Sequence, residues 1–196
     1  MKEIREDVRG FREPMYEIDP LFVNRWSPRA LGTDMSKEDL MACFEAARWA
    51  PSSYNNQSWR FMYATHEDEE WDTLHSLVNE FNQKWASDSY ALIVVASKTT
   101  FDHNGEESIT HSFDTGSAWE NFALEAAKRD LAAHGMQGIH YEKAREELDI
   151  PEDFEVEMMI AIGSKEDETQ LPEDMQAQPN GRKDMKEIVT KGNYDF

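Results

Sequence analysis

Two short apolar runs constrain the fold of this chain more than any other feature of its sequence. Residues 90–97 (YALIVVAS) and 156–163 (VEMMIAIG) carry apolar side chains at mostly consecutive rather than alternating positions. A strand that is apolar on both faces must be covered on both faces, so each run predicts a buried strand inside a sheet. The rest of the chain must therefore supply covering helices.

Apolar residues at helical spacing predict the first of these helices. It begins with a capping-box-like pair, Ser36 and Asp39, and the apolar residues that follow recur three or four positions apart. Pro51 ends it, because the residue before a proline is forced out of the helical region. The polar run PSSYNNQSW (51–59) is therefore a loop held at the end of a helix.

The remaining elements follow from the same periodicities. A long central helix is predicted after a cap at Asp114 or Thr115, with apolar residues at helical spacing as far as Leu131. The run HGMQG (134–138) then ends that helix as a turn between helices. We further expect a strand over 60–65, a helix over 67–86, a polar loop over 99–111 and a short helix over 141–148.

The order of these elements indicates the fold class. Helices and strands alternate irregularly, without repeats or a shift in composition, which predicts an α+β fold in a single domain, 1–196. Residues 1–24 are polar and interrupted by prolines, so we expect an N-terminal arm. Residues 164–196 are an acidic, loop-like C-terminal extension that contains a basic island, GRKDMKEIV (181–189).

The charge and cysteine content exclude several classes of function. Forty acidic and twenty basic residues give a formal charge of −20, which argues against broad binding of nucleic acid or anionic lipid, since both require clustered Lys and Arg. Cys43 is the one cysteine, so no internal disulfide forms and a core position is expected. Without a membrane-spanning run or the apolar middle of a signal peptide, we expect a cytoplasmic location.

Three polar clusters and one basic pair are candidates for a binding site. RWSPR (25–29) suits a phosphate, because a guanidinium bonds two oxygens at once, but surface ion pairs explain it equally well. PSSYNNQSW supplies uncharged donors and acceptors, although a capped turn has the same composition. HGMQG allows backbone to approach a flat ligand, but a helix C-cap is the simpler interpretation. Arg182 and Lys183 form either a second phosphate-binding arm or a surface pair.

Known catalytic motifs are largely missing. The sequence has no Gly-rich phosphate loop, no GxSxG and no paired-cysteine zinc pattern. His103 and His111 lie near acidic residues in a polar loop, but their spacing matches no recurrent metal site, so solvated histidines are expected and no metal is assigned. A cofactor would then have to supply the reactive group.

Taken in order, these segments resemble the nitroreductase family of flavoproteins. The resemblance runs from Arg25 to Val189 and is carried by RWSPR, EAARWAPSSYNNQSWRFMYA, DTGSAWENFALEAA, HGMQG, IPEDFEVEMMIAIG and GRKDMKEIV. PSSYNNQ is its most specific part. It implies a mixed or antiparallel sheet wrapped by helices, an intertwined homodimer, and one FMN at each of two sites in the interface.

The resemblance implies roles for the basic residues. Arg25, Ser27 and Arg182 would hold the FMN phosphate, with Lys183 as a helper and the bulky Trp26 beside them. A phosphate favours such a set, because charged donors form its strongest hydrogen bonds.

Other residues would contact the flavin ring. Arg29 would approach the N1 and C2 carbonyl edge, where negative charge collects on reduction. Gln137 and the backbone N–H of Gly138 would lie near N5, and Asn82 near the pyrimidine edge. The loop contributed by the other chain would comprise Pro51, Ser52, Ser53, Asn55 and Gln57.

The implied function is an FMN-dependent oxidoreductase. NAD(P)H would give hydride to flavin N5 and leave, and a nitroaromatic, quinone, enone or similar acceptor would then take the electrons in a ping-pong reaction. The flavin performs the chemistry, so no catalytic side chain is assigned. The alternatives are a non-catalytic FMN sensor or reservoir of the same fold, and an acidic interaction protein without cofactor. Departures from the family pattern, such as Ser58 where proline is common, bear on the acceptor.

Overall fold

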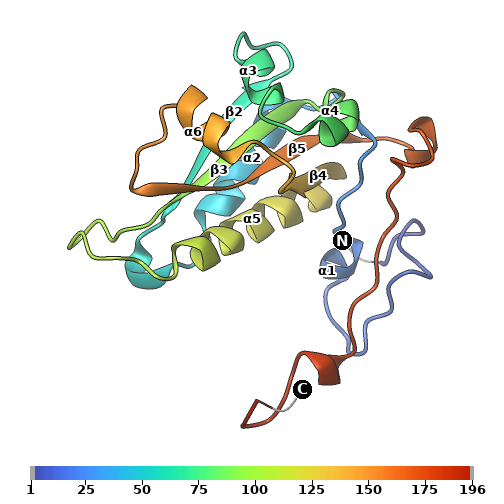
Figure 1. The fold of residues 1–196 in the computed structure, drawn as a ribbon. Coiled ribbons are helices and arrows are strands. Elements are labelled where there is room, and N and C mark those ends of the chain that lie inside the picture. The colour runs from blue at the N-terminus through green and yellow to red at the C-terminus, as the bar shows by residue number, and fades with distance from the viewer. Residues whose placement is uncertain (1–2, 195–196) are drawn as a thin grey trace.

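A five-stranded sheet forms the centre of the molecule (Figure 1). The computed structural model describes residues 3–194, and its strands are β1 (Leu31–Gly32), β2 (Trp59–Thr65), β3 (Ala91–Lys98), β4 (Leu131–Met136) and β5 (Phe154–Lys165). Their order is β1–β5–β3–β2, and β4 also pairs with β5. Every pairing of these strands is antiparallel, so the antiparallel form of the expected sheet is present.

Helices cover both faces of this sheet, as the α+β prediction requires (Figure 1). Helices α2 and α5 pack together on one face, and α3, α4 and α6 lie on the other. The helices and 3-10 turns are α1 (Pro20–Asn24), α2 (Lys37–Arg48), η1 (Ser53–Asn55), α3 (Trp71–His75), α4 (Glu80–Ala86), α5 (His111–Lys128), α6 (Tyr141–Glu147), η2 (Glu168–Gln170) and η3 (Met185–Glu187).

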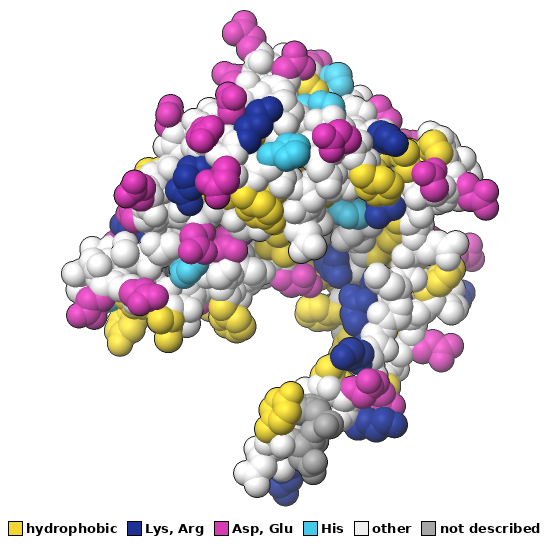
Figure 2. All heavy atoms as spheres, viewed as in Figure 1, with side chains coloured by type: hydrophobic (Ala, Val, Ile, Leu, Met, Phe, Trp, Pro, Cys, Tyr) yellow, Lys and Arg dark blue, Asp and Glu magenta, His cyan; other side chains and the backbone are white. Residues whose placement is uncertain are grey.

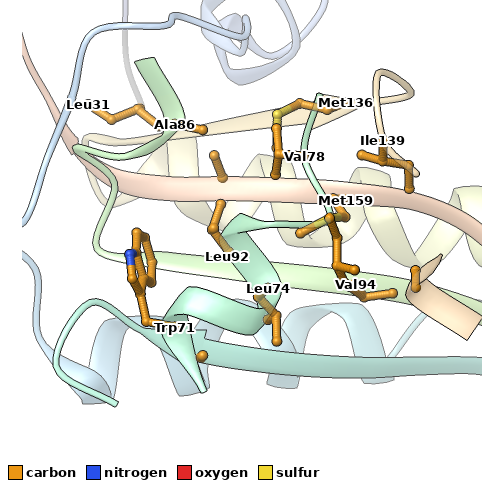
Figure 3. Packing of buried hydrophobic residues seen from close by; sticks show 14 of the residues in the cluster. Leu31, Trp71, Leu74, Val78, Ala86, Leu92, Val94, Met136, Ile139 and Met159 are labelled. Atoms are coloured by element: carbon orange, nitrogen blue, oxygen red, sulfur yellow. The ribbon is translucent and has the colours of Figure 1, made fainter. Parts of the chain in front are cut away.

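Side chains of β3 alternate between two apolar layers. Leu92 and Val94 belong to the layer under α3, α4 and α6, whereas Ile93 and Val95 belong to the layer under α2 and α5. All four are fully buried, and burying such a side chain contributes about 1.5–3 kcal/mol. Figure 3 shows Val94 beside Met159, its partner on β5. The covered strand predicted over 90–97 is confirmed.

Other predicted elements are confirmed as well. Helix α2 follows Ser36, whose Oγ accepts the backbone N–H of Asp39 at 3.1 Å, and it ends at Arg48, ahead of Pro51. Cys43 on this helix is fully buried, as expected. The segments predicted over 60–65, 141–148 and 156–163 are β2, α6 and the middle of β5.

Two predictions of helical segments are wrong. The segment 67–86 is two short helices, α3 and α4, because Val78 between them forms a β-bridge with Ile139. The run HGMQG is not a turn between helices, since residues 134–136 lie in β4 and pair with β5. Ala and Gly have little intrinsic preference for strands, so pairing with β5 determines this conformation.

The start of the long helix also differs from its prediction. Helix α5 begins at His111, and its N-cap is Thr110, which makes no side-chain capping bond. The Asp114 carboxylate instead accepts the backbone N–H of Ser53 at 3.0 Å, which ties the polar loop after α2 to this helix. Leu131, expected at the end of the helix, lies in β4.

The N-terminal segment packs on its own chain. It contains α1, which was not predicted, and Val8 within it is fully buried. Arg5 donates to the carboxylate of Asp130 at 2.5 Å. The C-terminal extension leaves the sheet after β5 and runs beside this segment (Figure 1). None of the helices within residues 3–194 combines the length and apolar character needed to cross a lipid bilayer.

Candidate functional site

The segment 25–29 lies at a cavity of about 440 Å³. Arg25 is the C-cap of α1, because its backbone N–H donates to the carbonyl of Leu21 at 3.0 Å, so this helix fixes where the segment starts. Arg25, Ser27 and Gln137 all line the cavity, which brings three predicted site residues together. The remaining lining residues, from α5, β4 and β5, are Trp119, Glu120, Gly135, Met136, Glu157 and Met158.

Arg25 and Trp26 differ in their surroundings. The Nε of Arg25 is 3.6 Å from Oε1 of Glu120 on α5, and half-exposed ion pairs of this kind contribute only about 0–1 kcal/mol. Trp26 is buried, and its indole N–H donates to Oδ2 of Asp7 at 3.2 Å. Trp26 therefore supports the segment from inside and does not line the cavity.

Arg29 carries a buried donor without a protein partner. Its Nη1 donates to the carbonyl of Met175 at 3.2 Å, and its guanidinium lies 5.3 Å from the centre of the Phe81 ring. Its Nε is buried and has no acceptor among the described residues. Glu168 holds the backbone in place by accepting the Arg29 N–H at 2.6 Å. Because buried N–H groups are nearly always paired, this atom is consistent with a bound acceptor group.

Gly138 follows β4 and contacts the helix that carries Phe81. The Asn82 side chain donates to the Gly138 carbonyl at 3.3 Å, and Asn79, the N-cap of α4, accepts the Asn82 N–H at 2.9 Å. A Cβ at position 138 would lie 2.5 Å from Nδ2 of Asn79 and 2.6 Å from Nδ2 of Asn82, so any larger residue would displace these two amide side chains. Two more predicted site residues, Asn82 and Gly138, are thus in contact, and Asn79 is a supporting residue that sequence analysis missed.

Arg182 and Lys183 lie in a separate groove of about 900 Å³ between the N-terminal segment and the C-terminal extension. The Arg182 guanidinium donates to the carbonyls of Asn180 and Gly181 at 3.3 and 2.9 Å. Within residues 3–194 neither basic side chain forms an ion pair. Figure 2 shows Lys and Arg side chains along the hollow beside this extension. Both cations are therefore available to an anion.

Arg12 lines the same groove and was missed by sequence analysis. It is buried, with 8% of its surface exposed. Burial is the main reason that its pKa is lowered to about 10, and repulsion from Arg182 and Arg25 adds to the shift. Arg12 in the groove thus lies close enough to Arg25 of the cavity and to Arg182 for their charges to interact. In the sequence, the run REDVRGFRE (5–13) did not indicate a basic site, because its arginines alternate with acidic residues as in an ordinary solvated surface segment.

The polar loop after α2 does not join these residues within one chain. Asn55 and Gln57 have φ of 55° and 49°, a left-handed conformation that non-glycine residues adopt only at a cost in free energy. Two hydrogen bonds of 3.0 Å maintain it, from the Gln57 N–H to Ser52 Oγ and from the Gln57 side chain to the Asn55 carbonyl. None of the predicted residues of this loop lines the cavity or the groove: Pro51, Ser52, Ser53, Asn55 and Gln57.

His111 was expected to be solvated, but it lies in a hydrogen-bonded network. Its Nδ1 is 2.7 Å from Oγ of Ser97, and that hydroxyl donates to Oε1 of Glu157 at 2.5 Å. Glu157 also accepts from Ser112 at 2.7 Å, so its carboxylate is satisfied by Ser97 of β3 and by Ser112 at the start of α5. The network fixes the orientation of Glu157 at the edge of the cavity.

Comparison with protein families matches residues 23–164 to the family described as the Nitroreductase family. The match covers more than half of the sequence, and the chain belongs to this family. Among curated proteins, none matches the sequence.

Solved structures share the fold over most of the chain. One described as an oxidoreductase containing FMN is 41% identical, with a TM-score of 0.89 over 94% of this chain and 96% of that one. A protein of Clostridium acetobutylicum, provisionally described as an NADH oxidase, is 24% identical, with a TM-score of 0.68 over 88% and 99%. A protein of Desulfovibrio desulfuricans, provisionally described as a nitroreductase in complex with FMN, is 22% identical, with a TM-score of 0.66 over 89% and 96%.

Proposed function

We propose that this chain binds FMN and transfers electrons from NADH or NADPH to a small acceptor such as a nitroaromatic, quinone or enone. Family membership and the 41% identical structure described as containing FMN support this function. The observation that carries it is the buried, unpaired Nε of Arg29, near the contact between Asn82 and Gly138.

The residues fit the chemical groups of FMN. A phosphate requires charged donors, and Arg25, Ser27 and Arg182 would bind it, with Lys183 nearby. The flavin edge that gains negative charge on reduction requires a fixed cation, and Arg29 is held by contacts to Glu168 and Met175 of the C-terminal extension and to Phe81 of α4. The single domain would thus use its C-terminal extension, 164–196, to complete the phosphate site.

The remaining ring contacts follow from the same assignment. Gln137 and the backbone N–H of Gly138 would lie beside N5, and Asn82 near the pyrimidine edge. When bound, FMN would supply the redox chemistry, taking two electrons from the nicotinamide and passing them to the acceptor in a second half-reaction. The side chains of this protein bind and orient the cofactor, so none is assigned as a catalytic acid or base.

We further propose that two identical chains share each site. The strained loop 51–57 would reach the cofactor of the partner chain, since its residues line neither the cavity nor the groove of its own chain. The apolar side chains exposed along the groove also favour a partner, because contiguous exposed apolar surface is typical of interfaces. They are Phe11, Met15, Tyr16, Ile18, Phe22, Met185 and Ile188.

The cofactor is tested by adding FMN to the purified protein and recording its visible spectrum. A yellow protein whose flavin bands bleach when NADH or NADPH is added without oxygen would support FMN binding and reduction. Steady-state oxidation of NAD(P)H with a quinone or nitroaromatic then separates an enzyme from a sensor, because a sensor does not turn over. A protein that takes up no FMN would overturn the proposal.

The role of Arg29 is tested by Arg29→Gln. Loss of one hydrogen bond to a charged group costs about 1.5–3 kcal/mol, so we expect FMN affinity to fall roughly 10- to 100-fold or flavin reduction to slow comparably. Arg9→Gln is the matched control, because Arg9 is exposed and its guanidinium bonds the Ile4 carbonyl. Unchanged FMN affinity and unchanged stopped-flow reduction in Arg29→Gln would refute this role.

The shared site is tested by mixing two variants of reduced activity, Arg29→Gln and Asn55→Asp. If each site takes Arg29 from one chain and Asn55 from the other, a mixed dimer contains one site with both substitutions and one intact site. Activity should therefore return on mixing after partial unfolding and refolding. If both residues of a site came from the same chain, no mixed dimer would hold an intact site and activity would stay low.

A further inference from the structure

Arg12 joins two parts of the chain that are far apart in sequence. Its Nη1 donates to the carbonyls of Val23 and Arg25 at 2.8 and 2.6 Å. Its Nε donates to the Asn180 carbonyl at 2.9 Å, and its Nη2 to Asn180 Oδ1 at 3.3 Å. Val23 and Arg25 lie at the end of α1, whereas Asn180 lies in the C-terminal extension. A single guanidinium therefore fixes the distance between these two segments.

The segments that Arg12 joins are those that carry the proposed phosphate ligands. Arg25 is itself one acceptor, and Arg182 follows Asn180 by two positions. Arg182 is exposed, and its side chain bonds only neighbouring carbonyls among the described residues. The other described contacts between the extension and the segment 25–29 are made by Glu168 and Met175, farther along the chain from Arg182 than Asn180 is, so the link through Arg12 is the one next to Arg182.

The charge of Arg12 is unusual for a buried group. Within residues 3–194 it has no ion pair. The charges of Arg182 and Arg25 destabilise its charge, and that of Asp7 partly offsets them. A buried cation beside two other cations is costly in free energy, unless an anion neutralises the group. In a chain with a formal charge of −20, this set of three arginines suits an anionic ligand.

We propose that Arg12 is a positioning residue for the phosphate of the bound flavin: it holds Arg25 and Arg182 so that both face one anion. This inference rests on the proposed FMN function. Arg12 does not act as the main phosphate ligand, because four of its hydrogen bonds already go to the protein. It acts through the two arginines that it places, and its charge adds to their attraction for the phosphate.

The geometry requires arginine at this position. A guanidinium has five N–H groups spread over a rigid plane, so it bonds acceptors on two sides at once. A lysine ammonium has three N–H groups on one atom, and it cannot reach the carbonyl of Val23 and both acceptors of Asn180 together. Arg12→Lys therefore keeps the charge and removes the link, whereas Arg12→Met removes both.

The test compares FMN with riboflavin, which has the same ring and ribityl chain but no phosphate. Dissociation constants are measured from the quenching of flavin fluorescence for the wild-type protein and for both Arg12 variants. We expect each variant to bind FMN at least about tenfold more weakly, which corresponds to about 1.4 kcal/mol, and riboflavin almost as well as wild type. Arg9→Met, at an exposed arginine in the same segment, should change neither affinity.

The other possible outcomes of this test would contradict the proposal. Equal losses for FMN and riboflavin would mean that Arg12 merely supports the fold of the whole site. Unchanged FMN affinity in folded Arg12→Lys would mean that the link is not needed, and this charge-preserving variant decides the question if Arg12→Met does not fold. Wild-type protein that binds riboflavin and FMN equally well would refute the phosphate role alone, whereas binding of neither flavin would overturn the proposed function itself.

Discussion

His134 on β4 contacts the segment 25–29 through its imidazole ring. Its Nδ1 is 2.9 Å from the carbonyl of Pro28, which can only accept, so this nitrogen carries the proton. Its ring lies 4.7 Å from that of Trp85. Burial is the main cause that lowers its pKa below the usual 6.5, and the charge of Arg29 also lowers it, although bonds to the carbonyls of Ser27 and Pro28 oppose the shift.

The protonation of His134 makes stability depend on pH. Because its pKa is lower in the folded chain than in the unfolded chain, the unfolded chain takes up the proton first as pH falls. Stability is therefore greatest above about 6.5 and is lost below it, by about 1.4 kcal/mol for each pH unit until the folded pKa is reached. We expect urea unfolding to show this loss between pH 7.5 and pH 5, and His134→Asn, which keeps a donor for Pro28, to reduce it.

The control for this prediction is His140→Asn, since the His140 side chain is exposed. It should leave the pH dependence as it is in the wild-type protein. A His134→Asn protein that loses the same free energy of unfolding between the two pH values would show that other groups cause the effect.

Arg12 shows why part of the site could not be predicted at the scale of single residues. Its hydrogen-bond partners lie 11, 13 and 168 positions away along the chain, so no local sequence pattern indicates its role. The motif residues Arg25, Ser27, Arg29 and Gly138 were predicted as site residues because the resemblance names them by position. Their partners, such as Glu168 on the Arg29 backbone, depend on folding and were not found.

At the scale of elements, Gly163 on β5 allows β1 and β5 to approach. A Cβ at this position would lie 2.1 Å from the carbonyl oxygen of Gly32 and 3.1 Å from the backbone N of Tyr90. Both are backbone atoms, so the strands themselves would have to move. Gly116 on α5 is the control position, because a Cβ there would have no other atom within 4 Å.

Replacing each of these glycines with alanine should change stability in opposite directions. We expect Gly163→Ala to lower the free energy of unfolding by several kcal/mol, in the range typical of strained or overpacked sites. Gly116→Ala should raise it by about 0.5–1 kcal/mol, because alanine is the better helix former. Urea unfolding followed by circular dichroism measures both. A Gly163→Ala protein as stable as the wild type would contradict the close approach of these strands.

The accuracy of the sequence predictions depended on whether each element is determined locally. β3, β5 and α2 were predicted because their own apolar patterns specify them. β4 was not, since LAAHGM continues the alanine-rich composition of the helix before it and becomes a strand only by pairing with β5. Likewise, the helical spacing over 67–86 gave no sign of the break, which arises from the bridge between Val78 and Ile139.

At the scale of the whole molecule, added salt should act in opposite directions on two properties. It should raise the stability of the acidic chain and lower the affinity of the basic phosphate site for its ligand. The chain has a formal charge of −20, so its folded form is destabilised by repulsion between carboxylates. The proposed phosphate site, in contrast, attracts its ligand through Arg25, Arg182 and Lys183. Both effects are Coulombic and both weaken as salt shortens the Debye length, from about 30 Å at 0.01 M to about 3 Å at 1 M.

Over that range of NaCl we therefore expect the melting temperature of the FMN-free protein to rise and its affinity for FMN to fall. NaCl is preferred to sulfate, because sulfate also strengthens apolar burial. Riboflavin is the control ligand: without a phosphate it should bind about equally well at both salt concentrations. If the affinities for riboflavin and for FMN fell by the same factor, the loss of affinity would not come from the phosphate. If the melting temperature fell instead, repulsion between carboxylates would not limit the stability of this fold.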